Sequence, residues 1–256
     1  MKATILDLNG KKKKDAELPS IFDTNYRPNL IIRAISASQS QKKQPQGRDT
    51  LAGKRNTAES WGTGRGKARV PRIKGGGTRA ANSGGFISMT VGGHLAHPPR
   101  SEKNLVKKIN KKEKKLALNS AIAATANEKL IRERGHVIEN LESHVLIFDD
   151  KIQTIKKTRD LVQILILTGL NSELERIKNK HIKSGKGKRR GRKYRRPKGP
   201  LIVAENHGIY EAARNIPGVD VVNIRNLCVE DLAPGSHAGR LTIWTESSFK
   251  AIAERV

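Results

Sequence analysis

Residues 201–204, Leu201-Ile-Val-Ala204, are a continuous apolar run. Such a run is typical of a strand buried on both faces. Similar runs and helix-like segments alternate to the end of the chain. We expect strands over residues 219–224 and 241–244, helices over 209–215 and 246–255, and a turn at Pro217-Gly218. This alternation predicts an α/β fold with a mainly parallel sheet and helices on both faces.

The first 44 residues are also expected to be folded. Thr4-Ile-Leu-Asp-Leu8 is predicted as a strand and Asn9-Gly10 as a turn. The lysine run at residues 11–14 then leads to a second short segment near Leu18. A helix is expected over residues 25–43, because a set of mainly apolar residues recurs with the spacing that places them on one face of a helix. That face consists of Leu30, Ile31, Ala34, Ile35 and Ser38.

Residues 101–180 show a similar pattern. Asn110 and Glu113 have the spacing of a capping box, which predicts a helix to about residue 127. Ser172 and Glu175 have the same spacing and predict a helix to about residue 180. Between these helices, Val145-Leu-Ile-Phe148 is predicted as a buried strand. A helix over residues 157–167 follows it, and Gly169 is suited to its C-terminal cap.

Residues 45–100 interrupt this pattern. Ten basic residues lie between Arg48 and Arg100, against two acidic ones, Asp49 and Glu59. A segment without apolar periodicity cannot offset its ordering entropy by burial, so we expect it to order only against a partner. Residues 1–256 are therefore expected to form one globular α/β domain, interrupted by this long extended loop and by a basic insertion at residues 183–198.

The insertion at residues 183–198 has ten basic residues among sixteen and no acidic residue. One interpretation is a solvated insertion or a nuclear-localisation-like patch. The other is a clamp on a polyanion, which is favoured because both ends adjoin predicted regular elements. Tyr194 lies inside the charge run and favours contact with a base or ribose.

The chain carries 51 Lys+Arg and 24 Asp+Glu, a formal net charge of +27. This charge predicts a polyanionic partner and binding that weakens as salt rises. A membrane is the weakest candidate, since the longest apolar stretch, residues 161–167, is far shorter than the roughly 20 residues of a spanning helix. No signal-peptide pattern is present at the N-terminus. The single cysteine, Cys228, excludes a disulfide framework and fits a reducing cytosol.

The segment Trp61-Gly-Thr-Gly-Arg-Gly-Lys-Ala-Arg-Val-Pro-Arg-Ile-Lys-Gly-Gly-Gly77 is the most informative. Its glycines allow close approach of the backbone to another surface, and its cations recur every two or three residues. Such a chain can follow a phosphate backbone; the alternative is a disordered basic linker. A phosphate-binding nucleotide loop is disfavoured, because Trp61 and Ala68 occupy positions where that motif needs Gly and Ser or Thr, and no apolar strand precedes the segment.

Other motifs favour structural duties over chemistry. His94 and His97 have no acidic or thiol partner nearby in the sequence, so we predict no metal site. Cys228 is expected to be a small buried group. Gly235-Ser-His-Ala-Gly239 lacks the spacing of a hydrolase elbow. Asp149-Asp150 follow a predicted strand and are assigned to a turn or helix start. We therefore predict no enzyme and no cofactor.

Several motifs resemble one family, the ribosomal protein L-four family of the large subunit. They occur in order along the chain: Trp61-Gly-Thr-Gly-Arg65, Ala68-Arg-Val-Pro-Arg-Ile-Lys-Gly75, Gly92-Gly-His-Leu-Ala-His-Pro-Pro99, Lys114 to Thr125, Gly191-Arg-Lys-Tyr-Arg-Arg-Pro197 and Asp231-Leu-Ala-Pro-Gly235. The His-Pro-Pro exit and the second insertion are similar to the archaeal and eukaryotic branch, and the short C-terminus favours an archaeon. Residues 80–91 are poorer in charge than the family's returning limb.

The resemblance implies a structural protein of the cytoplasmic ribosome. It also implies a loop that penetrates the large-subunit ribosomal RNA, supports assembly and lines a constriction of the nascent-peptide exit tunnel. Its expected partners are that RNA, neighbouring ribosomal proteins and the nascent peptide, and no membrane. The residues expected at the loop tip are Gly64, Arg65, Gly66, Lys67, Arg69 and Arg72.

The residues expected to contact ribosomal RNA lie in the loop and the insertion. They are Lys54, Arg55, Trp61, Arg65, Lys67, Arg69, Arg72, Lys74, Arg79, His94, His97, Arg100, Lys186, Lys188, Arg189, Arg190, Arg192, Lys193, Tyr194, Arg195 and Arg196. Two rival interpretations are a chromatin or DNA-binding protein, for which no helix-turn-helix or zinc-finger pattern is present, and an RNA-modifying enzyme, for which no cofactor motif is present.

Overall fold

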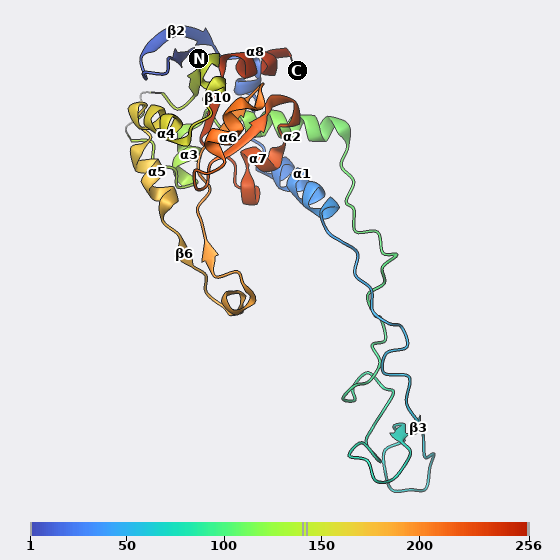
Figure 1. The fold of residues 1–256 in the computed structure, drawn as a ribbon. Helices are drawn as coiled ribbons and strands as arrows, with labels where there is room; N and C mark the ends of the chain where they lie inside the picture. Colours follow the sequence, from blue (N-terminus) through green and yellow to red (C-terminus); the bar gives the residue numbers. More distant parts are fainter. Residues whose placement is uncertain (1, 140, 142, 255–256) are drawn as a thin grey trace. The chain divides into compact units, whose positions relative to one another are not determined.

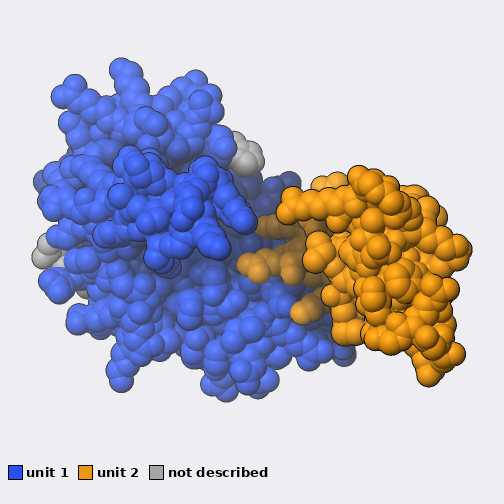
Figure 2. Space-filling model, turned by 90° about the horizontal axis from the view of Figure 1, so that it is seen from below, with its two compact units in different colours: residues 1–38, 108–256 blue, residues 39–107 orange. Residues whose placement is uncertain are grey.

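The computed structural model describes residues 2–139, 141 and 143–254. The chain divides into two compact units, one of residues 1–38 and 108–256 and the other of residues 39–107 (Figure 2). The first unit contains the α/β fold that the sequence predicts, with a sheet covered by helices (Figure 1). The second unit contains the whole of the expected loop, residues 45–100.

The central sheet has six strands in the order β2-β1-β5-β10-β8-β9. Their bounds are β1 Lys2–Leu6, β2 Lys12–Glu17, β5 Leu146–Phe148, β8 Leu201–Ala204, β9 Asp220–Asn223 and β10 Thr242–Thr245. All neighbouring pairs are parallel except β1 and β2, which form an antiparallel hairpin at one edge. The predicted mainly parallel sheet is confirmed.

Successive residues of the central strands are buried in two different cores. Leu201 and Val203 of β8 face one core, and Ile202 and Ala204 face the other. Side chains of a strand alternate between its two faces, so a strand covered on both faces is apolar throughout. In the first core, Trp244 of β10 meets the ring of Phe22 edge-on, with 6.3 Å between their centroids.

Each core is closed by its own helices. The first core contains buried residues of α1 (Pro28–Gln41), α2 (Lys111–Ala124), α7 (Val229–Leu232) and α8 (Glu246–Glu254). The second contains buried residues of α3 (Glu128–Glu133), α4 (Thr158–Leu167), α5 (Asn171–Lys178) and α6 (Tyr210–Ala213). Helices therefore cover both faces of the sheet, as predicted. Of the last predicted helix, Arg255 lies outside the described residues.

Two predicted capping boxes are wrong. Asn110 does precede α2, but its side chain makes no capping hydrogen bond, and Glu113 instead pairs with Arg33 at 2.7 Å. Ser172 lies inside α5, which begins one residue earlier at Asn171. The predicted cap at Gly169 is confirmed, because this glycine follows α4 with a φ of +88°.

The second short segment expected near Leu18 is β2, which ends at Glu17 and pairs with β1. It begins earlier than expected, at Lys12, so most of the lysine run lies within it. Only Ala16 among the residues of β2 is partly buried. Lysines suit such a sheet edge, because their charge opposes pairing with a further strand.

Candidate nucleic-acid interface

The loop has hydrogen-bonded structure of its own. Two short strands, β3 (Ala58–Glu59) and β4 (Arg72–Ile73), pair in antiparallel fashion. Both acidic residues of the loop are neutralised within it, Asp49 by Arg55 and Glu59 by Lys74. The hydrogen bond from Arg55 lowers the pKa of Asp49. The remaining loop cations have no carboxylate partner among the described residues, so the loop keeps a strong positive charge.

Trp61 is the centre of a cluster of cations at the expected loop tip. Lys67 Nζ lies 5.1 Å from the ring centroid, and the guanidinium carbons of Arg65 and Arg72 each lie 5.8 Å from it. Cations over an indole face are attracted by its quadrupole. The three cations repel one another, and a neighbouring polyanion or dissolved salt would weaken that repulsion.

In the returning limb of the loop, the backbone packs closely at glycine positions, and ion pairs play no part in the contacts described next. A Cβ on Gly93 would lie 1.9 Å from the carbonyl oxygen of Ile87, so only glycine fits there. His94 is hydrogen-bonded to the carbonyl of Phe86, and their rings lie 5.2 Å apart. Met89 and Val91 are almost fully exposed. An exposed apolar side chain that the sequence analysis did not select is a further candidate for contact with a partner.

The basic insertion forms a hairpin. Strands β6 (His181–Ile182) and β7 (Tyr194–Arg195) pair in antiparallel fashion, and the tip is a single 3-10 turn, η3, over Lys186–Arg190. Lys180 Nζ lies 4.4 Å and Lys193 Nζ 5.5 Å from the centroid of the Tyr194 ring. The ring is half exposed, which leaves part of it open to a partner.

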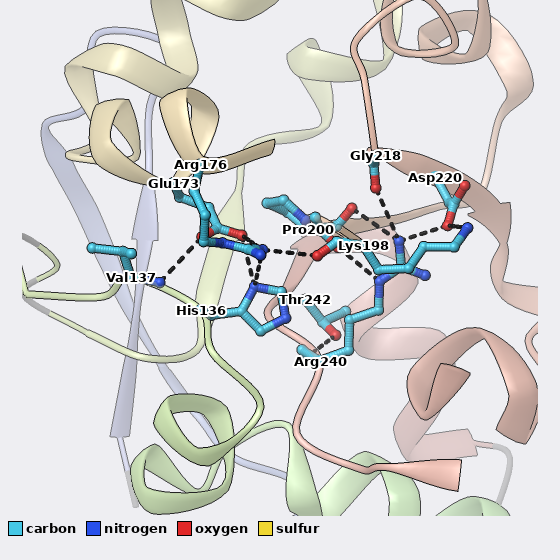
Figure 3. Close-up of polar contacts among 11 residues, drawn as sticks. His136, Val137, Glu173, Arg176, Lys198, Pro200, Gly218, Asp220, Arg240 and Thr242 are labelled. Carbon is cyan, nitrogen blue, oxygen red and sulfur yellow. Dashed lines mark hydrogen bonds and ion pairs between the residues drawn. The ribbon is translucent and has the colours of Figure 1, made fainter. Parts of the chain in front are cut away.

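Buried charges fix the base of this hairpin (Figure 3). Arg240, almost fully buried and two residues before β10, donates to the carbonyl of Gly199 at 2.8 Å and to Asp220 at 2.6 Å. Lys198, at the end of the hairpin, donates to the same Asp220 carboxylate at 2.8 Å. Burial would raise the pKa of Asp220, but Lys198 and Arg240 hold it below its usual value.

A second anchor lies on the other side of the hairpin base (Figure 3). Glu173 is fully buried and accepts hydrogen bonds from His136 Nδ1 at 2.7 Å and from Arg176 at 2.7 Å. Arg176 also donates to the carbonyl of Lys198 at 2.8 Å. Burial lowers the pKa of His136, which favours the neutral form of its ring. Its buried Nε2 has no hydrogen-bond partner among the described residues.

A cleft of about 1470 Å³ lies beside the hairpin base. It is lined by Glu133 and by many cations: Arg134, Arg176, Lys183, Arg195, Arg196 and Lys198. Arg134 donates to the carbonyls of Pro234 and His237, and no carboxylate of the described residues pairs with it. Burial, together with the charges of Arg240 and Arg176, lowers its pKa to about 10. The cleft is thus a concave surface whose lining carries more cations than carboxylates.

The predicted contact residues are accessible. Trp61, Arg72 and His94 are half-buried, and all the other predicted contact residues are exposed. The structure brings Trp61 together with Arg65, Lys67 and Arg72, and Tyr194 together with Lys193. Sequence reasoning missed Arg134, because the cleft is assembled from distant segments that carry no local pattern.

Other motifs have structural roles. Asp149 pairs with Lys13 at 2.5 Å, and Asp150 accepts from Ser247, which confirms their assignment to a helix start or turn. Cys228 was expected to be buried, and this is wrong: it is exposed immediately before α7. Among the described residues, no group of three or more potential metal ligands is found, and no helix is long and apolar enough to cross a membrane.

The fold and this interface define a class of protein, namely basic α/β proteins with two cationic extensions. The chain belongs to the Ribosomal protein L4/L1 family, whose pattern matches residues 16–255.

Three relatives, each named large ribosomal subunit protein uL4, match almost end to end. That of Methanosphaera stadtmanae is 48% identical over 99% of this chain and 96% of its own. That of Haloquadratum walsbyi is 46% identical over all of both chains, and that of Methanopyrus kandleri is 44% identical over 100% of this chain and 99% of its own.

The family resemblance drawn from the sequence is therefore confirmed, including its archaeal type. The protein is a ribosomal protein and not an enzyme, and it works in the cytoplasm as part of the ribosome. Membership of this family also removes the chromatin-protein and RNA-modifying-enzyme interpretations.

Proposed function

We propose that this protein is a structural constituent of the large ribosomal subunit that binds large-subunit ribosomal RNA and supports its assembly. In this proposal the α/β fold is one globular base, and residues 45–100 and 183–198 are its RNA-binding insertions. The names of its relatives place those proteins in the large subunit.

The observation that carries the proposal is the state of the hairpin cations. Among the described residues of the hairpin, only Lys198 has an ion-pair partner, and Lys186, Lys188 and the arginines from 189 to 196 are exposed. Exposed, unpaired cations on a hairpin with a buried and hydrogen-bonded base suit an RNA backbone. The cleft around Arg134 extends this surface and would receive a further phosphate.

The loop tip is proposed to line the exit tunnel and contact the nascent peptide. The Trp61 cluster supports this role, because it packs three cations of the tip around one ring and leaves the other tip residues exposed. A compact, charged tip fits a crevice in folded RNA better than an unstructured linker does.

Salt-dependent RNA binding tests the hairpin. Replacing Arg189, Arg190 and Arg192 by Gln should reduce the slope of log K against log salt by about 2, since each phosphate contact contributes about 0.7 to 0.9. The matched control replaces Lys151, Lys156 and Lys157, which are exposed elsewhere on the first unit. Equal effects of the two sets on binding to a large-subunit RNA fragment would contradict the proposal, because only net charge would then matter.

Crosslinking tests the tunnel contact. A photoreactive side chain at Lys67 should crosslink to a stalled nascent peptide in intact ribosomes, and one at Arg100, outside the tip, should not. If neither position, or both equally, yields a crosslink to the peptide, the tip does not line the tunnel.

A further inference from the structure

A second concave surface lies on the first unit, away from the hairpin residues. This groove, of about 630 Å³, has one wall on α2 and the other on the segment from Arg225 to Val229. Lys111, Lys115, Leu118 and Ile122 line the first wall, at the helical spacing that puts them on one stripe of α2.

The groove combines an apolar floor with a basic rim. Ile21, Ile122, Val229 and Ile252 belong to the first core, yet each also lines the groove. Lys111, Lys114 and Lys115 are exposed and have no ion-pair partner among the described residues. None of the described residues that line the groove is acidic.

We propose that the groove receives an acidic, amphipathic segment of a neighbouring protein in the large subunit. An amphipathic helix or strand would place apolar side chains on the floor and carboxylates against the rim lysines. An RNA backbone would satisfy the lysines but would offer the floor no aliphatic side chain. The inference concerns a different surface from the proposed RNA contacts and does not depend on them.

Site-specific crosslinking in purified large subunits tests the inference. A genetically encoded photoreactive side chain replaces Asn119, which lines the groove, and the control replaces Lys112, which is exposed on the same helix but does not line it. We expect position 119, and not position 112, to crosslink to a protein. Mass spectrometry should map the product to a segment that contains both acidic and apolar residues.

A charge reversal then tests the complementarity. Lys115→Glu should lower the yield of this crosslink by about fivefold or more, whereas Lys112→Glu should leave it unchanged. A ribonuclease-sensitive product at position 119, no product above the control, a segment without acidic residues, or a yield unaffected by Lys115→Glu would each overturn the proposal. The hairpin variants above should not change this crosslink, so the two proposals can fail separately.

Discussion

At the scale of single residues, Arg240 carries a charge inside the first unit. Its guanidinium is almost fully buried and donates to backbone carbonyls of Gly199 and Asp231 and to the Asp220 carboxylate. A buried charge is tolerated only where its donors are used, and removal of one partner leaves the others desolvated and unpaired.

We predict that Arg240→Met lowers the free energy of unfolding by about 2 to 4 kcal/mol, because those carbonyls lose their donor. Urea denaturation followed by circular dichroism measures this. Lys250→Met is the control, since its pair with Glu246 is exposed and should matter little. An Arg240→Met midpoint equal to that of the control would show that the network does not stabilise the fold.

His136 gives a pH-dependent prediction at the same scale. Its pKa is lowered from 6.5 by burial, so the unfolded chain binds more protons than the folded chain just below that pH. Stability from this group is therefore present above pH 6.5 and falls as the pH drops. Glu173, whose pKa is lowered despite its burial by bonds from Arg176 and His136, adds a similar loss below pH 4.5.

We predict that His136→Asn, which keeps a donor toward Glu173, flattens the dependence of unfolding free energy on pH between about pH 7.5 and 5.5. Denaturation series at several pH values measure the slope, and His237→Asn, at an exposed histidine, serves as the control. A His136→Asn slope as steep as that of the unaltered protein would assign the titration to another group.

At the scale of elements, the loop depends on close backbone approach. A Cβ at Gly93 would overlap the Ile87 carbonyl, and one at Gly53 would lie 2.5 Å from backbone atoms of residues 93 and 94. No residue with a Cβ fits these places without a shift of the chain. The two limbs of the loop can thus pack this closely because Gly53 and Gly93 have no Cβ atom.

We predict that Gly93→Ala separates the limbs and raises the rate of trypsin cleavage within the loop severalfold, because locally opened segments are cut first. The thermal midpoint should stay unchanged, since no core residue belongs to the loop. Gly76→Ala is the matched control, because a Cβ there meets open space. Equal cleavage of the two variants would contradict the packing seen at Gly93.

At the scale of the whole molecule, the described residues of both cores come only from residues 1–38 and 108–256. The buried apolar area that stabilises the fold therefore lies in the first unit. The second unit contains the exposed cations of the loop and the expected loop tip. Such a division would let the first unit fold before the second binds the RNA that we propose as its partner.

We predict that replacing residues 55–90 by a short Gly-Ser linker leaves a single cooperative thermal transition with a midpoint close to that of the full chain. Incorporation of the shortened protein into large subunits should be impaired, because the proposed RNA contacts of the loop are gone. Calorimetry and sedimentation of subunits measure the two effects. Loss of the cooperative transition would mean that the loop takes part in folding after all.

The sequence by itself determined the α/β class, the buried strands at residues 145–148 and 201–204, and the two basic insertions. Each of these depends on residues adjacent in the chain, as an apolar run or a charge density, so the local pattern contains the information. The family motifs were equally local, because the loop tip and the hairpin are each one short segment.

Only the tertiary structure decided what depends on residues far apart in the chain. The polar segment Lys12–Glu17 forms strand β2 because it pairs with the edge of β1. Glu113 does not cap α2 because it forms an ion pair with Arg33 of α1. The cleft around Arg134 and the groove beside α2 arise where distant segments meet. Their chemistry comes from burial and from the charges that packing places together, neither of which a local pattern records.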